Sequence, residues 1–242
     1  MDFVRDSNLD RLRNEQFDVL VVGGGITGLG VALDAASRGL SVGLVEKDDF
    51  SSGTSSKSSK LIHGGLRYLQ QGEIGLVYEA LHERQRLIRN APHLVNVLPF
   101  MIPILTRDGV ISKKIARALG SALWMYDLTG GWRIGKLHKR LKAAQANTHL
   151  PTINADRMSS AYLYYDAAAD DARLCVTVAR TAALYGAVVA NQCPVQKILH
   201  DENGKVCGAR VAPLASEPFE IQARCVINAA GVWARSEERR VG

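Results

Sequence analysis

The chain has 242 residues, which suits one large domain or one and a half ordinary ones. Apolar residues make up 47% of it and charged residues 22%, as in a globular protein with a real core. The longest apolar runs are too short to span a bilayer, and the N-terminus lacks the apolar stretch of a secretory signal. These values exclude a disordered or membrane-spanning chain and give no sign of secretion.

The four cysteines are widely and singly spaced, with no CxxC pair: Cys175, Cys193, Cys207 and Cys225. Such spacing predicts reduced, mostly buried thiols in a cytosolic protein, and we expect no metal site.

The first part of the chain has the pattern of a strand, a helix and a second strand. Residues 17–22 form a short β-branched run typical of a buried parallel strand. Small and apolar residues follow at helical spacing over 26–38, and Gly39 stands where a helix-ending glycine belongs. Residues 41–45 predict the second strand, which ends at Glu46.

The remaining elements are predicted from periodicity and turn residues. Residues 49–60 are rich in Ser, Gly and Thr, like a flexible linker, and 143–160 look turn-like. A hairpin is expected around Asn203-Gly204, between 195–200 and 206–212. The other predicted helices cover 74–88, 111–128 and 170–185, and the other strands 99–105, 161–165, 187–190, 219–222 and 225–229.

The glycine-rich turn after the first strand fits the pattern G-x-G-x-x-G at Gly23, Gly25 and Gly28. The first glycine permits a tight turn, the second lets the backbone approach a pyrophosphate, and the third lets helix and strand pack closely. The helix N-terminus offers N–H groups and a positive dipole end to phosphates. Glu46 has the spacing of an acid that binds a ribose and repels a 2′-phosphate, which disfavours NADP. A plain strand–helix turn and a solvated acid are the alternatives.

The glycine turn does not distinguish FAD from NAD, but the segment 54–69 (TSSKSSKLIHGGLRYL) does. Its hydroxyls suit phosphate and ribityl oxygens, and Gly64-Gly65 would let the backbone lie against a flat ring. His63, Arg67 and Tyr68 supply donors beyond that ring. We therefore expect FAD.

Four stretches resemble the FAD-dependent (respiratory) glycerol-3-phosphate dehydrogenases, within the D-amino-acid-oxidase-like flavoproteins: FDVLVVGGGITGLGVALDAASRGLSVGLVEKDDF, SSKLIHGGLRYL, EALHER and DDARL. The resemblance runs from Phe17 to Trp233 and is weaker over 107–150. It implies an α/β fold, with a Rossmann-like FAD-binding domain of the GR2 or D-amino-acid-oxidase type and part of an α+β substrate domain.

The domain bounds that we expect from this resemblance are 1–98 for the first part of the FAD-binding domain and 161–234 for its continuation. Residues 99–160 would be a partial substrate- or membrane-facing insertion. Residues 235–242 resemble a translated sequencing adapter and are expected to be a non-native tail. Because family members are about twice this long, we expect an N-terminal fragment that lacks the C-terminal half and cap domain and is incomplete for catalysis.

The resemblance also implies site residues. Arg67 and Tyr68 would meet the anionic substrate, against a surface arginine and a packed aromatic as alternatives. His63 would contact the flavin or act as the catalytic base. Asp170, Asp171 and Arg173 match a family signature that we interpret as structural. The implied cofactor contacts are Gly23, Gly25, Thr27, Gly28, Glu46, Thr54, Ser55, Ser59, Lys60, Leu61, His63, Gly64, Gly65, Val195, Ala230 and Gly231.

The implied reaction is oxidation of glycerol 3-phosphate to dihydroxyacetone phosphate, with hydride passing to the flavin and electrons to quinone. Two rivals are another flavin oxidase of the superfamily and a non-catalytic dinucleotide-binding module.

Quinone chemistry requires a membrane surface, and nine basic residues oppose two acidic ones over 107–142. The aromatic and apolar residues among them suit an interfacial helix on anionic lipid: Leu119, Leu123, Trp124, Tyr126 and Trp132. A solvated helix face is the alternative, and no motif indicates nucleic-acid binding. We therefore expect a cytoplasmic protein, peripheral on the inner face of the cytoplasmic membrane.

Overall fold

The computed structural model describes residues 3–65, 68, 71–105 and 113–234, and the chain divides into two compact units. Unit 1 contains Met1–Ser59 and Asp171–Gly242, and unit 2 contains Lys60–Asp170. These bounds differ from the expected ones at 98/99 and 160/161, which fall inside two strands, β4 (Asn96–Leu105) and β6 (Met158–Ala168). The two strands pair with each other from Asn96 to Leu105. Their hydrogen bonds keep both strands in one unit.

Unit 1 is built on a six-stranded sheet in the order β7-β2-β1-β10-β9-β8. The first four strands run parallel, and β10, β9 and β8 form an antiparallel meander. The predicted parallel strand pair and the hairpin at Asn203-Gly204 are confirmed. The expected strands 219–222 and 225–229 are one continuous strand. The bounds are β1 (Gln16–Val22), β2 (Val42–Val45), β7 (Val188–Ala190), β8 (Val195–His200), β9 (Val206–Val211) and β10 (Phe219–Asn228).

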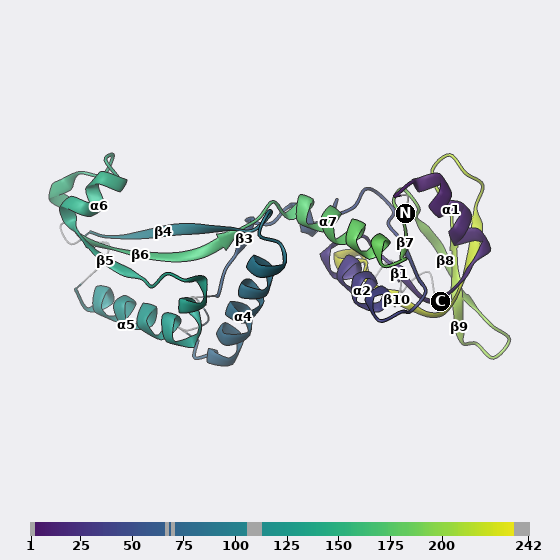
Figure 1. The fold of residues 1–242 in the computed structure, drawn as a ribbon, viewed down its shortest axis with the longest axis horizontal. Coiled ribbons are helices and arrows are strands. Elements are labelled where there is room, and N and C mark those ends of the chain that lie inside the picture. Colours follow the sequence, from purple (N-terminus) through teal and green to yellow (C-terminus); the bar gives the residue numbers. More distant parts are fainter. Residues whose placement is uncertain (1–2, 66–67, 69–70, 106–112, 235–242) are drawn as a thin grey trace. The chain divides into compact units, whose positions relative to one another are not determined.

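Helices cover both faces of this sheet. On one face, α2 (Ile26–Ser37) and α7 (Asp171–Leu184) pack side by side, as Figure 1 shows. Alanines such as Ala32 and Ala179 are fully buried there and let the helices approach closely. On the other face, α1 (Arg5–Asn14) buries Leu9 and Leu12. The sequence did not predict α1 because these two leucines alone form its apolar stripe.

Two steric constraints require glycine in the turn that joins β1 to α2. Gly23 has φ of +116°, a conformation that side chains with a Cβ rarely adopt. A Cβ on Gly28 would lie 2.0 Å from the carbonyl oxygen of Gly23. The first turn of α2 therefore lies directly against the end of β1, as the glycine pattern predicts.

Unit 2 contains a second, antiparallel sheet with β6 at its centre. β4 pairs along one edge of β6, while β3 (Leu61–Ile62) and β5 (Lys139–Lys142) pair along the other. The predicted helices 74–88 and 111–128 correspond to α4 (Ile74–Asn90) and α5 (Lys113–Thr129), which Figure 1 shows on one face of the sheet. Buried residues pack beneath them in two clusters, which include Ile104, Leu123 and Tyr162, and Val77, Leu81 and Tyr126.

Short elements complete the fold. The turn-like stretch 143–160 instead contains α6 (Ala143–His149) and the start of β6, because Ala146 and Met158 share a small apolar cluster. Short 3-10 helices are η1 (Thr54–Ser56), η2 (Gly131–Ile134), η3 (Ala155–Arg157) and η4 (Gly231–Trp233).

Cysteine burial is uneven, although all four thiols are free. Cys175 and Cys193 are buried as expected, whereas Cys207 is half-buried and Cys225 exposed. Over the described ranges, no helix is both long and apolar enough to cross a membrane. Nor do three or more His, Cys, Asp or Glu side chains gather as a metal site in that part of the chain.

Two alanine substitutions in α2 test the close packing at its first turn. Gly28→Ala would force a methyl group against the Gly23 carbonyl, and we expect it to destabilise the protein by about 3 kcal/mol. The melting temperature would then fall by roughly 6–12 °C. Gly30→Ala is the matched control, since nothing lies within 4 Å of its Cβ position and helical alanine is favoured by about 0.5–1 kcal/mol. Equal melting temperatures by circular dichroism would contradict this packing.

Candidate functional site: a cavity at the glycine turn

A cavity of about 310 Å³ lies in unit 1, where parallel strands β1, β2 and β10 end. In open α/β sheets, ligands bind beyond the carboxyl ends of the strands. The glycine turn contributes Gly23, Gly25 and Thr27 to its wall. The other wall segments follow β2, precede β8 and follow β10, and include Glu46, Lys47, Ser52, Gly53, Thr54, Ser55, Cys193, Pro194, Val195, Ala229, Ala230, Gly231 and Trp233.

The N-terminus of α2 points its backbone donors at this cavity. Its N-cap residue, Gly25, has no side chain to cap the helix. A distant residue supplies one acceptor, because the Ser55 hydroxyl accepts a 3.0 Å hydrogen bond from the Ile26 N–H. The first turn of a helix carries four N–H groups without intrahelical partners and the positive end of the dipole. An anionic group therefore suits this position.

Glu46 is held rigidly at the cavity wall. The residue is 8% exposed, and its carboxylate accepts hydrogen bonds from the Gly24 N–H at 2.6 Å and the Asp48 N–H at 2.9 Å. An ionised carboxylate has about four lone-pair sites, so it retains the capacity to accept from a hydroxyl in the cavity. The sequence predicted the acid but not its bond to the glycine turn.

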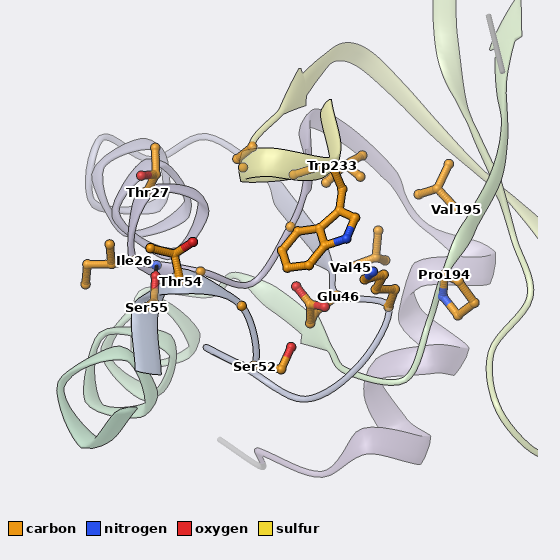
Figure 2. A pocket seen from close by; sticks show the side chains of 18 of the residues that line it. Ile26, Thr27, Val45, Glu46, Ser52, Thr54, Ser55, Pro194, Val195 and Trp233 are labelled. Carbon is orange, nitrogen blue, oxygen red and sulfur yellow. Dashed lines mark hydrogen bonds between the residues drawn. The ribbon is translucent and has the colours of Figure 1, made fainter. Parts of the chain in front are cut away.

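Trp233 is a cavity residue that the sequence did not point to. Figure 2 shows its indole reaching from η4 into the middle of the cavity, between Thr54 and Ser55 on one side and Pro194 and Val195 on the other. The Lys47 Nζ lies 4.3 Å from the ring centroid. A Cβ on Gly53 would lie 2.8 Å from the same ring. The position of Trp233 just after the Ala230-Gly231 turn, which was itself predicted to contact the cofactor, could have indicated that this aromatic residue lies in the site.

The wall opposite the glycine turn is apolar. Cys193, Pro194 and Val195 form part of it. Burial raises the pKa of the Cys193 thiol to about 12, and nearby Arg5 lowers it only in part. The thiol therefore stays protonated near neutral pH and contributes to the wall as a small apolar group.

Most of the predicted cofactor residues meet in this cavity. Those that line it are Gly23, Gly25, Thr27, Glu46, Thr54, Ser55, Val195, Ala230 and Gly231. Gly28 is buried behind the turn, and exposed Ser59 ends the first segment of unit 1. The stretch 49–60, which could pass for a linker, thus contributes η1 and part of the cavity wall.

The remaining predicted residues belong to unit 2. A second cavity there is lined by Leu61, His63, Gly65 and Tyr68, together with Gln71, Phe100, Tyr164 and Asp166. The Lys60 Nζ lies 3.5 Å from Asp170 Oδ2. Tyr68 is 38% exposed, so it is not a packed core aromatic. Arg67 lies outside the described residues.

His63 and Gly64 have defined hydrogen bonds in unit 2. His63 is exposed, and its Nδ1 accepts a 3.1 Å hydrogen bond from the Gly65 N–H. Gly64 is buried, and its N–H lies 3.1 Å from the Tyr126 hydroxyl and 3.2 Å from Asp166 Oδ1. The sequence did not predict these partners of Gly64.

The unit 1 cavity has the features that the ADP half of FAD requires. Gly25 leaves the backbone open to a phosphate, since the nearest atom to a Cβ there is the Ser55 hydroxyl at 3.1 Å. A fixed carboxylate follows β2, where an acid of this spacing would accept from a ribose hydroxyl, and an apolar wall stands opposite. The residues present therefore fit the group.

Comparison with known proteins agrees with this geometry. The family model described as FAD dependent oxidoreductase matches residues 18–242. A mitochondrial glycerol-3-phosphate dehydrogenase from Mus musculus is 44% identical over 96% of this chain and 33% of its own length. A glycerol-3-phosphate dehydrogenase from Mycobacterium leprae is 47% identical over 93% of this chain and 38% of its own length. The chain thus spans about a third of the curated relatives it matches, which are longer than the twofold length expected from the resemblance.

A solved structure has the same fold. The glycerol-3-phosphate dehydrogenase from Bacillus halodurans, complexed with FAD, superposes with a TM-score of 0.71 at 31% identity, covering 96% of this chain and 37% of that one. The expected fold class, a Rossmann-like FAD-binding domain of the D-amino-acid-oxidase type, is confirmed, and FAD is the cofactor of the matching family. With a glycine turn, a fixed acid and a family match over residues 18–242, this chain belongs to the FAD-dependent oxidoreductases.

Proposed function

We propose that the chain is the FAD-binding part of a glycerol-3-phosphate dehydrogenase, which oxidises sn-glycerol 3-phosphate to dihydroxyacetone phosphate and passes electrons to quinone. The observation that carries this proposal is the nucleotide cavity at the glycine turn, in a chain 44–47% identical to dehydrogenases of that name from Mus musculus and Mycobacterium leprae. The segment SSKLIHGGLRYL supports the choice of substrate.

In this proposal, unit 1 binds the ADP half of FAD. The pyrophosphate lies at the N-terminus of α2, where Gly25 and Thr27 present backbone N–H groups. Glu46 accepts a hydrogen bond from the ribose while its two backbone donors hold it in place. The apolar wall that includes Val195 would hold the adenine.

Unit 2 contributes the residues assigned to the flavin and substrate. When bound, FAD accepts the hydride removed from the secondary alcohol. Lys60, Leu61, Gly64 and Gly65 are assigned to the flavin side. Arg67 and Tyr68 are assigned to the substrate, because a guanidinium binds a phosphate with two parallel hydrogen bonds.

His63 is better suited to donate a hydrogen bond than to remove a proton. Because Nδ1 accepts from the Gly65 N–H, a neutral ring carries its proton on Nε2. That nitrogen then presents a donor. This arrangement supports the flavin-contact role over the catalytic-base role.

We further propose that the intact enzyme is peripheral on the inner face of the cytoplasmic membrane, with α5 near anionic lipid. Trp124 is 58% exposed and Leu128 is 76% exposed. Arg117 lies on the same helical face, seven residues before Trp124. Two residues expected at this surface are not there, because Leu123 and Tyr126 are buried in the core of unit 2.

Substitution of the fixed acid tests cofactor binding. Glu46→Gln would place an amide where two backbone N–H groups donate, and would remove the charged acceptor for the ribose. A hydrogen bond to a charged group contributes about 1.5–3 kcal/mol, so we expect FAD affinity to fall by about 10- to 100-fold. Flavin fluorescence titration measures the change. Exposed Glu220→Gln on β10 is the matched control, and equal affinities in the two variants would remove Glu46 from the site.

The substrate is tested with the chain loaded with FAD and a redox dye. Any dye reduction should occur with glycerol 3-phosphate and not with glycerol or glycine, since only the first carries both a secondary alcohol and a phosphate. A yellow protein that reduces no dye would support the non-catalytic binding module. Reduction with glycine instead would support an amine oxidase and contradict the proposed substrate.

Anionic vesicles test the membrane surface. Replacing Lys113, Lys114, Arg117, Lys139 and Arg140 with glutamine removes five positive charges, each of which contributes about 1 kcal/mol near an anionic bilayer. We expect sedimentation with phosphatidylserine vesicles to weaken at least about tenfold. Substituting five basic residues of unit 1 (Arg11, Arg13, Lys197, Lys205 and Arg210) gives the control. Unchanged binding in the first variant would exclude α5 and β5 as the membrane surface.

A further inference from the structure

Unit 2 contains a buried polar cluster outside the nucleotide cavity. Arg84 from α4 is 1% exposed, Tyr126 from α5 is 1% exposed and Asp166 from β6 is 4% exposed. Arg and Asp are almost never fully buried unless they are paired. Removal of two charges from water costs several kcal/mol per ion before their attraction offsets it. The cluster therefore calls for an explanation beyond helix packing, which Val77 and Leu81 already provide.

The Arg84 and Tyr126 side chains converge on one oxygen atom of Asp166. Arg84 Nη1 and the Tyr126 hydroxyl both donate to Asp166 Oδ1, each at 2.5 Å. Arg84 Nη1 also donates to the Tyr126 hydroxyl oxygen at 2.8 Å. Burial raises the pKa of Tyr126, with Arg84 opposing and Asp166 reinforcing that shift. The hydroxyl stays protonated at neutral pH and continues to donate to Asp166.

The same cluster binds a backbone amide of the predicted flavin segment. The Gly64 N–H is directed at both the Tyr126 hydroxyl and Asp166 Oδ1. A Cβ on Gly64 would lie 2.1 Å from Leu81 Cδ2 and 2.5 Å from the Tyr126 hydroxyl. Glycine is thus required here because the backbone lies directly against the cluster. On either side of it, His63 and Gly65 line the unit 2 cavity.

We infer that Arg84, Tyr126 and Asp166 are positioning residues, which fix the Gly64 amide and so orient the His63-Gly64-Gly65 turn at the wall of the unit 2 cavity. The inference rests on the proposed function only for the identity of the group that this turn faces. Without the cluster, the turn would keep the His63–Gly65 hydrogen bond and the bond from the Tyr68 N–H to the Gly65 carbonyl, and neither of these holds the Gly64 amide. Arg84 and Tyr126, which do not line the cavity, thus act on it through the backbone, whereas Asp166 also forms part of its wall.

Amide hydrogen exchange measured by NMR tests this role without any cofactor. Tyr126→Phe keeps the ring in the core but removes the hydroxyl, and we expect exchange at the Gly64 amide to accelerate about fivefold to tenfold. Tyr162→Phe is the matched control, since Tyr162 is also a buried tyrosine of unit 2 and its hydroxyl lies near Gly120, not Gly64. Asp166→Asn is a second variant of nearly equal volume, should Tyr126→Phe fail to fold.

The visible circular dichroism of bound FAD provides a signal that a purely structural role would not change. We expect this signal to differ from wild type in Tyr126→Phe, whose altered side chain does not line the cavity, and to be unchanged in Tyr162→Phe. Gly64 exchange equal to that of the control, or an unaltered flavin signal, would overturn the positioning role. If the wild-type chain binds no FAD, the proposed function fails, whereas Gly64 exchange still decides the inference.

Discussion

The contact between Gly28 and the Gly23 carbonyl fixes how α2 meets β1 in unit 1, and the geometry of the nucleotide cavity depends on it. Because no Cβ separates them, the first turn of α2 lies directly against the end of β1. That contact aims the helix N-terminus at the space beyond the parallel strands. It also brings the Gly24 amide within reach of the Glu46 carboxylate at the end of β2. The Gly28–Gly23 contact therefore determines the positions of both the N–H donors proposed for the phosphates and the carboxylate proposed for the ribose.

In unit 2 a glycine again permits a close backbone approach, here to polar side chains. Gly64 lacks a Cβ where its backbone meets Leu81 and Tyr126. There the close approach delivers an amide to a buried polar cluster. In both units, a glycine lets side chains fix the backbone of a loop, and the loop in turn presents its neighbours to a cavity. Side chains distant in sequence thereby act on segments that the proposal assigns to FAD.

Local patterns predicted the elements around the nucleotide cavity well. The β1–α2–β2 unit follows from a buried strand, a helical repeat and glycines, all within thirty residues of one another. The β8–β9 hairpin follows from Asn203-Gly204. Polar elements were missed, because α1 and α6 each bury only a small apolar stripe.

Long-range features could not be predicted in the same way. The domain bounds depend on the pairing of β4 with β6, whose partner residues are at least fifty positions apart. Arg84 and Asp166 are 82 residues apart and meet only in the folded unit. Trp233 enters the cavity from the far end of the described chain. No periodicity within one segment encodes such contacts.

A titration of tryptophan fluorescence with ADP, the half of the cofactor assigned to unit 1, most directly tests whether the unit 1 cavity binds FAD. Because the Trp233 indole lies in the cavity, ADP should change its emission saturably, and Trp233→Phe should abolish the change. Adenosine 2′,5′-bisphosphate should have little effect, because Glu46 repels the 2′-phosphate. No response to ADP, or an equal response to both nucleotides, would contradict the assignment of this cavity to FAD.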